Sequence, residues 1–126
     1  MELINEFTLE GKNFVDIDFS EVKTIDEFAG MAADVKSVVA KHNENSLYTI
    51  TNIENMRVDS ISKDIIADLL VHNKPYVKYG VIIGIDGIKK VMANSILRAI
   101  ERTNMGFAFS KEQAIEWLLQ QEDTDG

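Results

Sequence analysis

The segment Asp59-Ser60-Ile61-Ser62 holds the side chains of this chain that are best suited to a switch. It follows a strand-forming segment, residues 47–53, and directly precedes a helical pattern. A phosphate on Ser60 or Ser62 would meet the unpaired N–H groups and the positive end of that helix. Either serine could instead only cap the helix. We therefore predict a switch formed by Asp59, Ser60 and Ser62, with capping as the competing use. The basic residues near them in sequence are Arg57 and Lys63.

A second segment, Gly84-Ile85-Asp86-Gly87, precedes Lys89 and Lys90 at another strand-to-helix junction. Backbone N–H groups and lysines at a helix start can bind an anion, so Gly87, Lys89 and Lys90 form a weak anion-site candidate. The spacing matches neither the Walker A loop nor the dinucleotide-binding glycine motif. Asp86 also places a negative charge in the mouth of such a site. A tight turn is the use of these glycines that the pattern favours.

Two aspartates, Asp16 and Asp18, alternate along a predicted strand and could suggest acid–base or divalent-metal chemistry. No third ligand or histidine continues this pattern along the strand, so a solvated strand face is the preferred interpretation. The two histidines, His42 and His72, fall near predicted helix C-termini, where positive charge is favourable. The chain has no cysteine. We therefore predict no catalytic residues, no metal site, no cofactor and no enzymatic activity.

Length and composition indicate one globular domain over residues 1–120, followed by a flexible acidic tail over residues 121–126. The chain has 126 residues, of which 45% are hydrophobic, and a formal net charge of −8. The electric field of this net negative charge repels the phosphate backbones of nucleic acids, so a nucleic-acid partner is not expected. No targeting segment or apolar stretch of membrane-spanning length is present, and the absence of cysteine fits a reducing compartment. We expect a cytoplasmic protein.

Alternating hydrophobic patterns predict an α/β fold in which a hairpin at residues 6–19 is followed by strands and helices in turn. Parallel pairing with right-handed crossovers then gives a mixed five-stranded sheet with about four helices. The expected strands after the hairpin are 47–53, 77–85 and 107–109, with 77–85 in the sheet interior. The expected helices begin after Thr24, at Ser60 or Ser62, after Asp86 and after Ser110. In the third helix we expect Ile88, Val91, Met92, Leu97 and Ile100 to face inward.

Several segments together resemble small bacterial proteins classed as STAS-like, relatives of the sporulation anti-sigma-factor antagonist. The segments are Asn73–Lys78, Gly84–Val91 with Asn94, and Phe107–Leu118. The resemblance covers about residues 6–119 and implies an architecture shared with STAS regulatory domains and similar to the CRAL-TRIO lipid-transfer fold, without implying a reaction. In antagonist-type STAS domains the phosphorylated serine lies in an Asp-Ser-Ser-Gly segment. Asp59-Ser60 is similar to its start, whereas Ile61 and Ser62 stand where serine and glycine would be expected.

Two functions from different classes follow from these patterns. The first is a non-catalytic regulatory or protein-interaction domain, switched by phosphorylation at residues 59–62, whose partner is another protein or a second copy of this chain. The alternative is a carrier that binds a small apolar or lipid-like ligand between the sheet and the helices. Methionines and aromatic residues, including Met56, Met92, Met105 and Trp117, would supply the soft lining of such a site.

Overall fold

The computed structural model describes residues 3–56 and 59–121, and the chain opens with an antiparallel hairpin. Strand β1 (Ile4–Leu9) pairs with β2 (Lys12–Asp18). The turn between them uses Glu10 and Gly11, both with positive φ, at 50° and 77°. Phe7 and Phe14 stack across the two strands with ring centroids 5.0 Å apart. The predicted hairpin is therefore confirmed.

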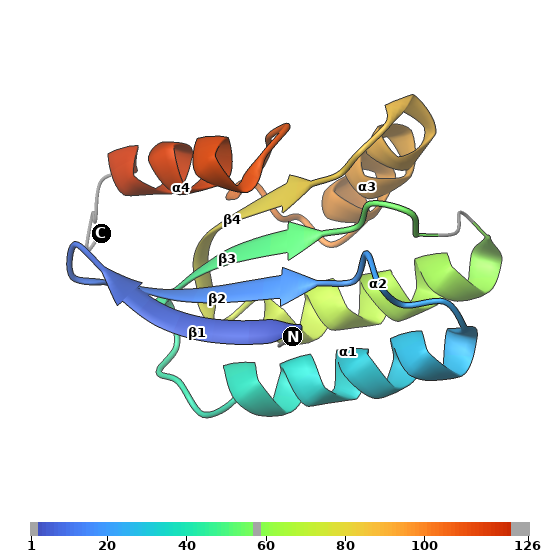
Figure 1. Cartoon of the computed structure of the whole chain (residues 1–126), viewed down its shortest axis with the longest axis horizontal. Coiled ribbons are helices and arrows are strands. Elements are labelled where there is room, and N and C mark those ends of the chain that lie inside the picture. Colours follow the sequence, from blue (N-terminus) through green and yellow to red (C-terminus); the bar gives the residue numbers. More distant parts are fainter. Residues whose placement is uncertain (1–2, 57–58, 122–126) are drawn as a thin grey trace.

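Helices and strands then alternate to the end of the described chain (Figure 1). The elements are α1 (Ile25–Val39), β3 (Leu47–Asn52), α2 (Ser60–Asn73), β4 (Val77–Ile83), α3 (Gly87–Ala99), β5 (Met105–Phe107) and α4 (Lys111–Gln120). The five strands lie in the order β1-β2-β3-β4-β5, and β2 to β5 are parallel. This is the predicted mixed five-stranded α/β sheet.

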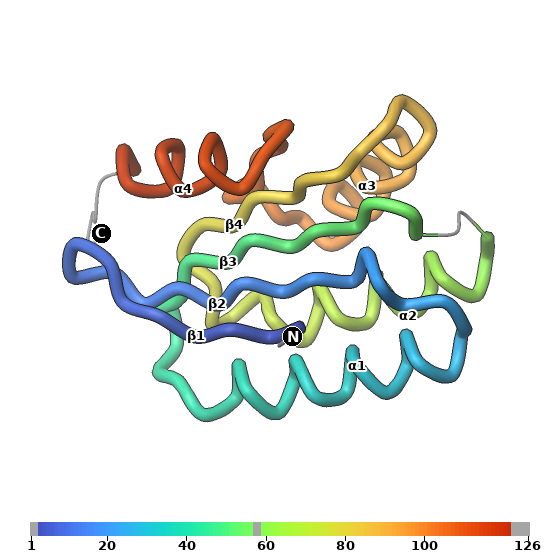
Figure 2. Tube along the Cα trace, viewed as in Figure 1, coloured from blue at the N-terminus to red at the C-terminus, as the bar shows by residue number. Residues whose placement is uncertain are grey.

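The helices cover the two faces of the sheet unequally. Helices α1 and α2 lie side by side along one face (Figure 2), and α3 contributes to the same core. Helix α4 packs on the opposite face, mainly against β4 and β3. Right-handed crossovers between neighbouring parallel strands place successive helices on one face. Only the last helix, which no strand follows in the described chain, crosses to the other.

Strand β4 is an interior strand, as predicted, because it lies between β3 and β5 and is covered on both faces. Ile82 faces the core of α1, α2 and α3. Val81 and Ile83 face the smaller core beneath α4, together with Ala114 and Leu118. A run of apolar residues with little alternation is what such two-sided burial requires.

Strand β5 occupies residues 105–107, not the predicted 107–109. The side-chain amide of Asn104 donates hydrogen bonds of 2.9 Å to both the Val77 and Lys78 carbonyls, and the strand starts two residues earlier than expected. Gly106 then lies beneath the Trp117 ring, where a Cβ would be only 3.3 Å from ring carbons. The chain leaves the sheet after this point, and Phe109 is 93% exposed.

Helix α3 turns a different face to the core than the one we predicted. Met92 and Leu97 are buried, as expected, and Ile100 is half-buried, whereas Ile88 and Val91 are 71% and 72% exposed. The helix has two apolar stripes at three- and four-residue spacing, and only one of them can face the sheet. The buried stripe begins at Lys89, whose ammonium group finds a backbone acceptor inside the protein.

None of the helices in residues 3–56 and 59–121 has the length and apolar character needed to cross a lipid bilayer. The predicted acidic tail, apart from Gln121, lies outside the described residues.

Candidate functional site

The candidate site lies at the edge of the sheet where the parallel strands end and the four helices begin (Figure 1). Each helix starts with a side chain that accepts a hydrogen bond from a backbone N–H in its first turn. Such caps satisfy the amide groups that a helix start leaves unpaired. The capping residues are Thr24, Asp59, Asp86 and Ser110, and all but Asp59 were predicted for this role.

The cap of α2 is Asp59, which corrects our expectation that Ser60 or Ser62 caps this helix. The Asp59 carboxylate accepts the Ser62 N–H at 2.8 Å. Ser60 is the first helical residue and its side chain is exposed, whereas Ser62 is only 1% exposed. The side-chain cap of this helix start is therefore Asp59 and not Ser60. The predicted neighbour Arg57 lies outside the described residues, and Lys63 is exposed.

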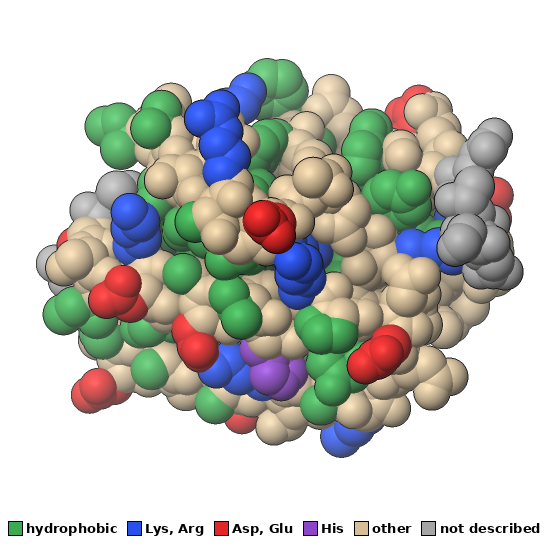
Figure 3. All heavy atoms as spheres, turned by 180° about the vertical axis from the view of Figure 1, so that it is seen from behind, with side chains coloured by type: hydrophobic (Ala, Val, Ile, Leu, Met, Phe, Trp, Pro, Cys, Tyr) green, Lys and Arg blue, Asp and Glu red, His purple; other side chains and the backbone are tan. Residues whose placement is uncertain are grey.

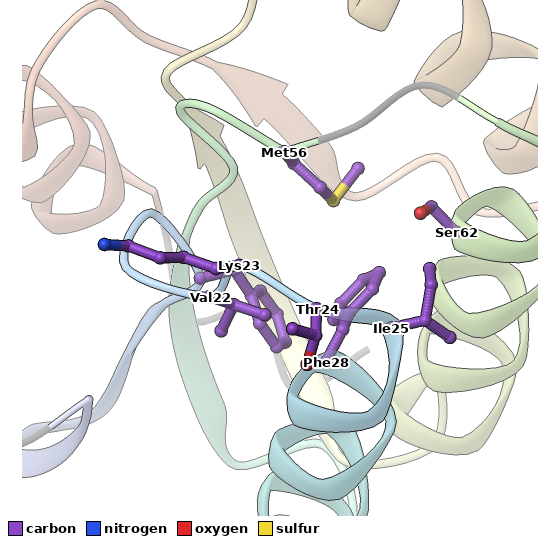
Figure 4. A pocket seen from close by; sticks show the side chains of 8 residues that line it. Val22, Lys23, Thr24, Ile25, Phe28, Met56 and Ser62 are labelled. Carbon is purple, nitrogen blue, oxygen red and sulfur yellow. The ribbon is translucent and has the colours of Figure 1, made fainter.

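Ser62 lies at a small internal pocket between the starts of α1 and α2 (Figure 4). Its hydroxyl is directed from α2 toward Met56, and Phe28 and Ile25 of α1 form the opposite wall. The free volume is about 20 Å³, close to that of one or a few water molecules. A kinase could reach Ser62 only if the start of α2 opened. The structure thus separates an accessible Ser60 from an enclosed Ser62.

Removing the cap should distinguish the roles of Asp59 and Ser60. We expect Asp59→Ala to lower the free energy of unfolding by about 0.5–2 kcal/mol, the usual loss for an N-cap. Ser60→Ala should change it by less than about 0.5 kcal/mol, as for other exposed substitutions. Urea unfolding followed by circular dichroism measures both values. A larger loss for Ser60→Ala than for Asp59→Ala would contradict this assignment of the cap.

The residues of the weak anion-site candidate do not surround one open position that an anion could occupy. Asp86 caps α3 by accepting the Lys89 N–H at 3.0 Å, so a carboxylate already occupies the helix start. The Lys89 ammonium is buried and donates to the Ile53 carbonyl at 3.2 Å. Lys90 lies over the Phe107 ring, 5.6 Å from its centroid. Gly87 has open space around it. The two lysines thus point away from a common anion position.

A shallow crevice separates the β4–α3 connection from the segment that precedes α4. Its free volume is about 370 Å³, and both polar and apolar residues line it. Glu54 and Asn55 contribute from the connection after β3, Asp86 and Lys89 from the start of α3, and Phe109 from the segment before α4. The crevice lies outside the carboxyl ends of the strands, where α/β sheets commonly bind their ligands and partners.

Exposed apolar side chains surround this edge, and sequence reasoning missed most of them. Ile61 in the first turn of α2 is 56% exposed and Ile88 in the first turn of α3 is 71% exposed. Phe109, before α4, is almost fully exposed. Figure 3 shows hydrophobic side chains at the surface in the upper left part of that view, where α3 lies. Their position beside a helix cap, where solubility favours polar residues, was the signal available in the sequence.

The other candidate groups make local contacts. Asp16 pairs with Lys111 of α4 at 2.5 Å. Asp18 accepts hydrogen bonds from the Ser20 N–H and hydroxyl at 2.8 and 2.5 Å. His42 at the end of α1 pairs with Glu6. Within the described ranges, no group of three or more His, Asp or Glu side chains is arranged to hold a metal ion. Asp16 thus joins β2 to α4, and Asp18 stabilises the turn that follows β2.

No protein-family model matches this chain, and no curated protein matches it significantly.

Proposed function

We propose that this protein is a non-catalytic regulatory domain. It binds a protein partner through the end of its sheet at which the parallel strands reach their carboxyl termini. The observation that carries the proposal is that exposed Ile61, Ile88 and Phe109 lie at or just before the starts of α2, α3 and α4, beyond the carboxyl ends of the parallel strands. Large apolar side chains that stay in water cost free energy unless a partner covers them. Aromatic and aliphatic anchors of this kind contribute most of the binding energy in protein interfaces. The resemblance to STAS-like proteins is the second support.

The capping pattern favours binding over catalysis. Asp59, Asp86 and Ser110 each use a side-chain oxygen to accept a backbone N–H of their own helix. Groups committed in this way serve the fold. A regulatory role needs a surface for the partner and one residue that can change its charge.

Ser60 is the residue that we propose for the switch. It is exposed, it lies in the first turn of α2, and its neighbour Ile61 is one of the exposed apolar side chains. A phosphate there adds about −1.5 to −2 charges, and the positive end of α2 tolerates them without loss of fold. The same charge would oppose burial of Ile61 against an apolar partner surface. Phosphorylation should therefore weaken binding and leave the domain folded.

Affinity purification from the host with variant baits tests this proposal. We expect Ile61→Ser and Phe109→Ser each to reduce recovery of a specific partner at least about tenfold, which corresponds to about 1.4 kcal/mol for each anchor. Ser60→Asp should reduce recovery similarly, because it places a charge at the contact. Quantitative mass spectrometry of the eluates provides the measurement, and thermal melts establish that each bait is folded.

The matched control is Val71→Ser. Val71 is 52% exposed in the last turn of α2, at the far end of that helix from Ile61. This variant loses the same kind of exposed apolar surface away from the proposed contact, so partner recovery should equal that of the wild type. If the wild type, Ile61→Ser and Phe109→Ser recover the partner equally, the proposed interface is contradicted. If Ser60→Asp recovers the partner as well as the wild type does, while Ile61→Ser and Phe109→Ser do not, only the proposed switch is contradicted.

A further inference from the structure

Strand β1 forms one edge of the sheet (Figure 1). The Leu3 carbonyl accepts the Asp18 N–H at 2.8 Å, so this residue pair bonds across to the side of β2. In an antiparallel pair, the residues that bond to the partner strand alternate along the chain. The N–H and C=O groups of Ile4, Glu6 and Thr8 therefore point away from β2. No strand of the described chain lies on that side.

This edge lacks the features with which proteins usually protect an open strand. Lysine or proline residues, bulges and very short strands are the common means of protection. Strand β1 has six residues with neither lysine nor proline, and its register with β2 runs without a bulge. The opposite edge strand, β5, has only three residues. Of the two edges, β1 is thus the one that is suited to accept an added strand.

A shallow groove lies beside this edge, between β1 and one face of α1. Its free volume is about 740 Å³, and Ile4 and Met31 give it an apolar lining. Helix α1 contributes Glu27, Gly30, Met31 and Asp34, whose three- and four-residue spacing places them on one face. At Gly30 a Cβ would meet nothing within 4 Å, so the groove is open there. A strand added to β1 would place every second side chain on the side of this groove.

The groove is acidic. Glu21, Glu27 and Asp34 line it and are exposed, and none of its described lining residues is lysine, arginine or histidine. Within residues 3–56 and 59–121, none of these three carboxylates has an ion-pair partner. Glu27 and Asp34 lie two turns apart, about 10 Å along the helix axis. Side chains on one face of a strand follow each other at about 7 Å, so two long basic side chains can reach both carboxylates.

We propose that the edge of β1 and this groove bind an extended basic segment of another protein as an additional strand of the sheet. The backbone of the segment pairs with Ile4, Glu6 and Thr8, and its lysine or arginine side chains face Glu27 and Asp34.

The charges disfavour a second copy of this chain as the occupant. Antiparallel pairing of β1 with itself, centred on Glu6, would place the two Glu6 side chains opposite each other. It would also bring together two chains that each carry a formal net charge of −8. The proposal goes beyond the function proposed above and does not depend on the exposed apolar side chains that carry it.

Binding of short synthetic peptides tests the proposal. The probe is acetyl-Lys-Val-Lys-Thr-Lys-Val-Lys-amide, titrated into the protein by isothermal calorimetry at low ionic strength. A peptide with glutamate in place of each lysine keeps the strand-forming residues and reverses the charge, and it should bind at least about tenfold more weakly. A third peptide, with proline in place of valine and threonine, keeps every lysine but cannot pair as a strand. It should also bind at least about tenfold more weakly.

Amide hydrogen exchange shows whether the basic peptide pairs with β1. In the free protein the N–H groups of Glu6 and Thr8 point to the open edge and should exchange rapidly, whereas that of Phe7 points to β2 and should exchange slowly. With the basic peptide at about ten times its Kd, exchange at Glu6 and Thr8 should slow about tenfold, because only the unbound fraction remains open. Attraction between charges alone would not protect these two amides.

Paired variants locate the charges that attract the peptide. Glu27→Gln combined with Asp34→Asn removes two groove carboxylates with little change of shape. The affinity for the basic peptide should fall at least about threefold, the usual scale for two exposed ion pairs. The matched control combines Glu101→Gln with Glu116→Gln, which removes two exposed carboxylates beyond the end of α3 and on α4. This control should keep the wild-type affinity, and thermal melts establish that both proteins are folded.

Equal affinity for the basic and acidic peptides would contradict the charge complementarity, and equal affinity for the proline peptide would contradict strand addition. Unchanged exchange at Glu6 and Thr8 with the basic peptide bound would place the peptide elsewhere on the surface. Full affinity in the folded variant with Glu27→Gln and Asp34→Asn would do the same. Any one of these results overturns the proposal.

Discussion

Replacing Ile83 by aspartate is expected to abolish folding. Ile83 is 7% exposed and lies in the small core beneath α4, which also contains Phe14 and Leu118. A carboxylate there either loses its hydration or must take up a proton, and both cost free energy. The loss should exceed about 4 kcal/mol, a large part of the about 5–15 kcal/mol by which such domains are stable. Soluble yield and thermal melting by circular dichroism measure the outcome.

The matched control is the same substitution at an exposed isoleucine. Ile88 is 71% exposed in the first turn of α3, where a negative charge also interacts favourably with the helix dipole. Ile88→Asp should therefore melt cooperatively, with a free energy of unfolding within about 0.5 kcal/mol of the wild type. If Ile83→Asp melts cooperatively at a similar temperature, β4 is not an interior strand and the sheet order given above is wrong.

Much of the fold could be predicted because its patterns are local. The change from alternating residues to three- and four-residue spacing marks each helix, and Thr24 and Ser110 carry capping signatures. The nearly continuous apolar run of β4 indicates burial on both faces. Right-handed crossovers then leave little freedom for the order of the strands.

Helix phase and strand ends were harder to predict because they depend on contacts between distant residues. Ile88 and Lys89 are adjacent, and residue type alone would bury the isoleucine. Lys89 is buried instead because the Ile53 carbonyl, 36 residues away, accepts a hydrogen bond from its ammonium group. Strand β5 likewise begins where Asn104 reaches the Val77 and Lys78 carbonyls. The pattern of neighbouring residues in the sequence does not indicate such a distant hydrogen-bond partner.

The same holds for the candidate sites: their local patterns could be predicted, and their contacts between distant residues could not. The junction at residues 59–62 was visible as a strand-to-helix transition, but a serine in a first helical turn can be exposed or buried. The phase of α2 decides that Ser60 faces solvent and Ser62 the interior. A small interior cavity between the sheet and the helices α2 and α3 could not be anticipated at all. Its polar residues, Thr49, Thr51 and Arg102, come from separate elements and meet only when the sheet and helices have packed.

Gly84→Ala is expected to destabilise the domain strongly at the connection that shapes the crevice. Gly84 has a φ of +74°, a conformation that costs residues with a side chain about 1–2 kcal/mol. A Cβ there would lie 2.6 Å from both the Glu54 backbone nitrogen and the Asn52 side-chain oxygen. These two atoms already hydrogen-bond to each other at 2.9 Å, so neither can move away freely. The total loss should be about 2–4 kcal/mol in urea unfolding.

The same substitution at two other glycines isolates the cause of that loss. Gly87 begins α3 and Gly30 lies inside α1, and a Cβ at either position meets nothing within 4 Å. Gly30→Ala should raise the free energy of unfolding by about 0.5–1 kcal/mol, the usual preference for alanine within a helix. Gly87→Ala should leave it nearly unchanged. Equal stability of Gly84→Ala and Gly87→Ala would mean that the β4–α3 connection does not pack against the segment after β3.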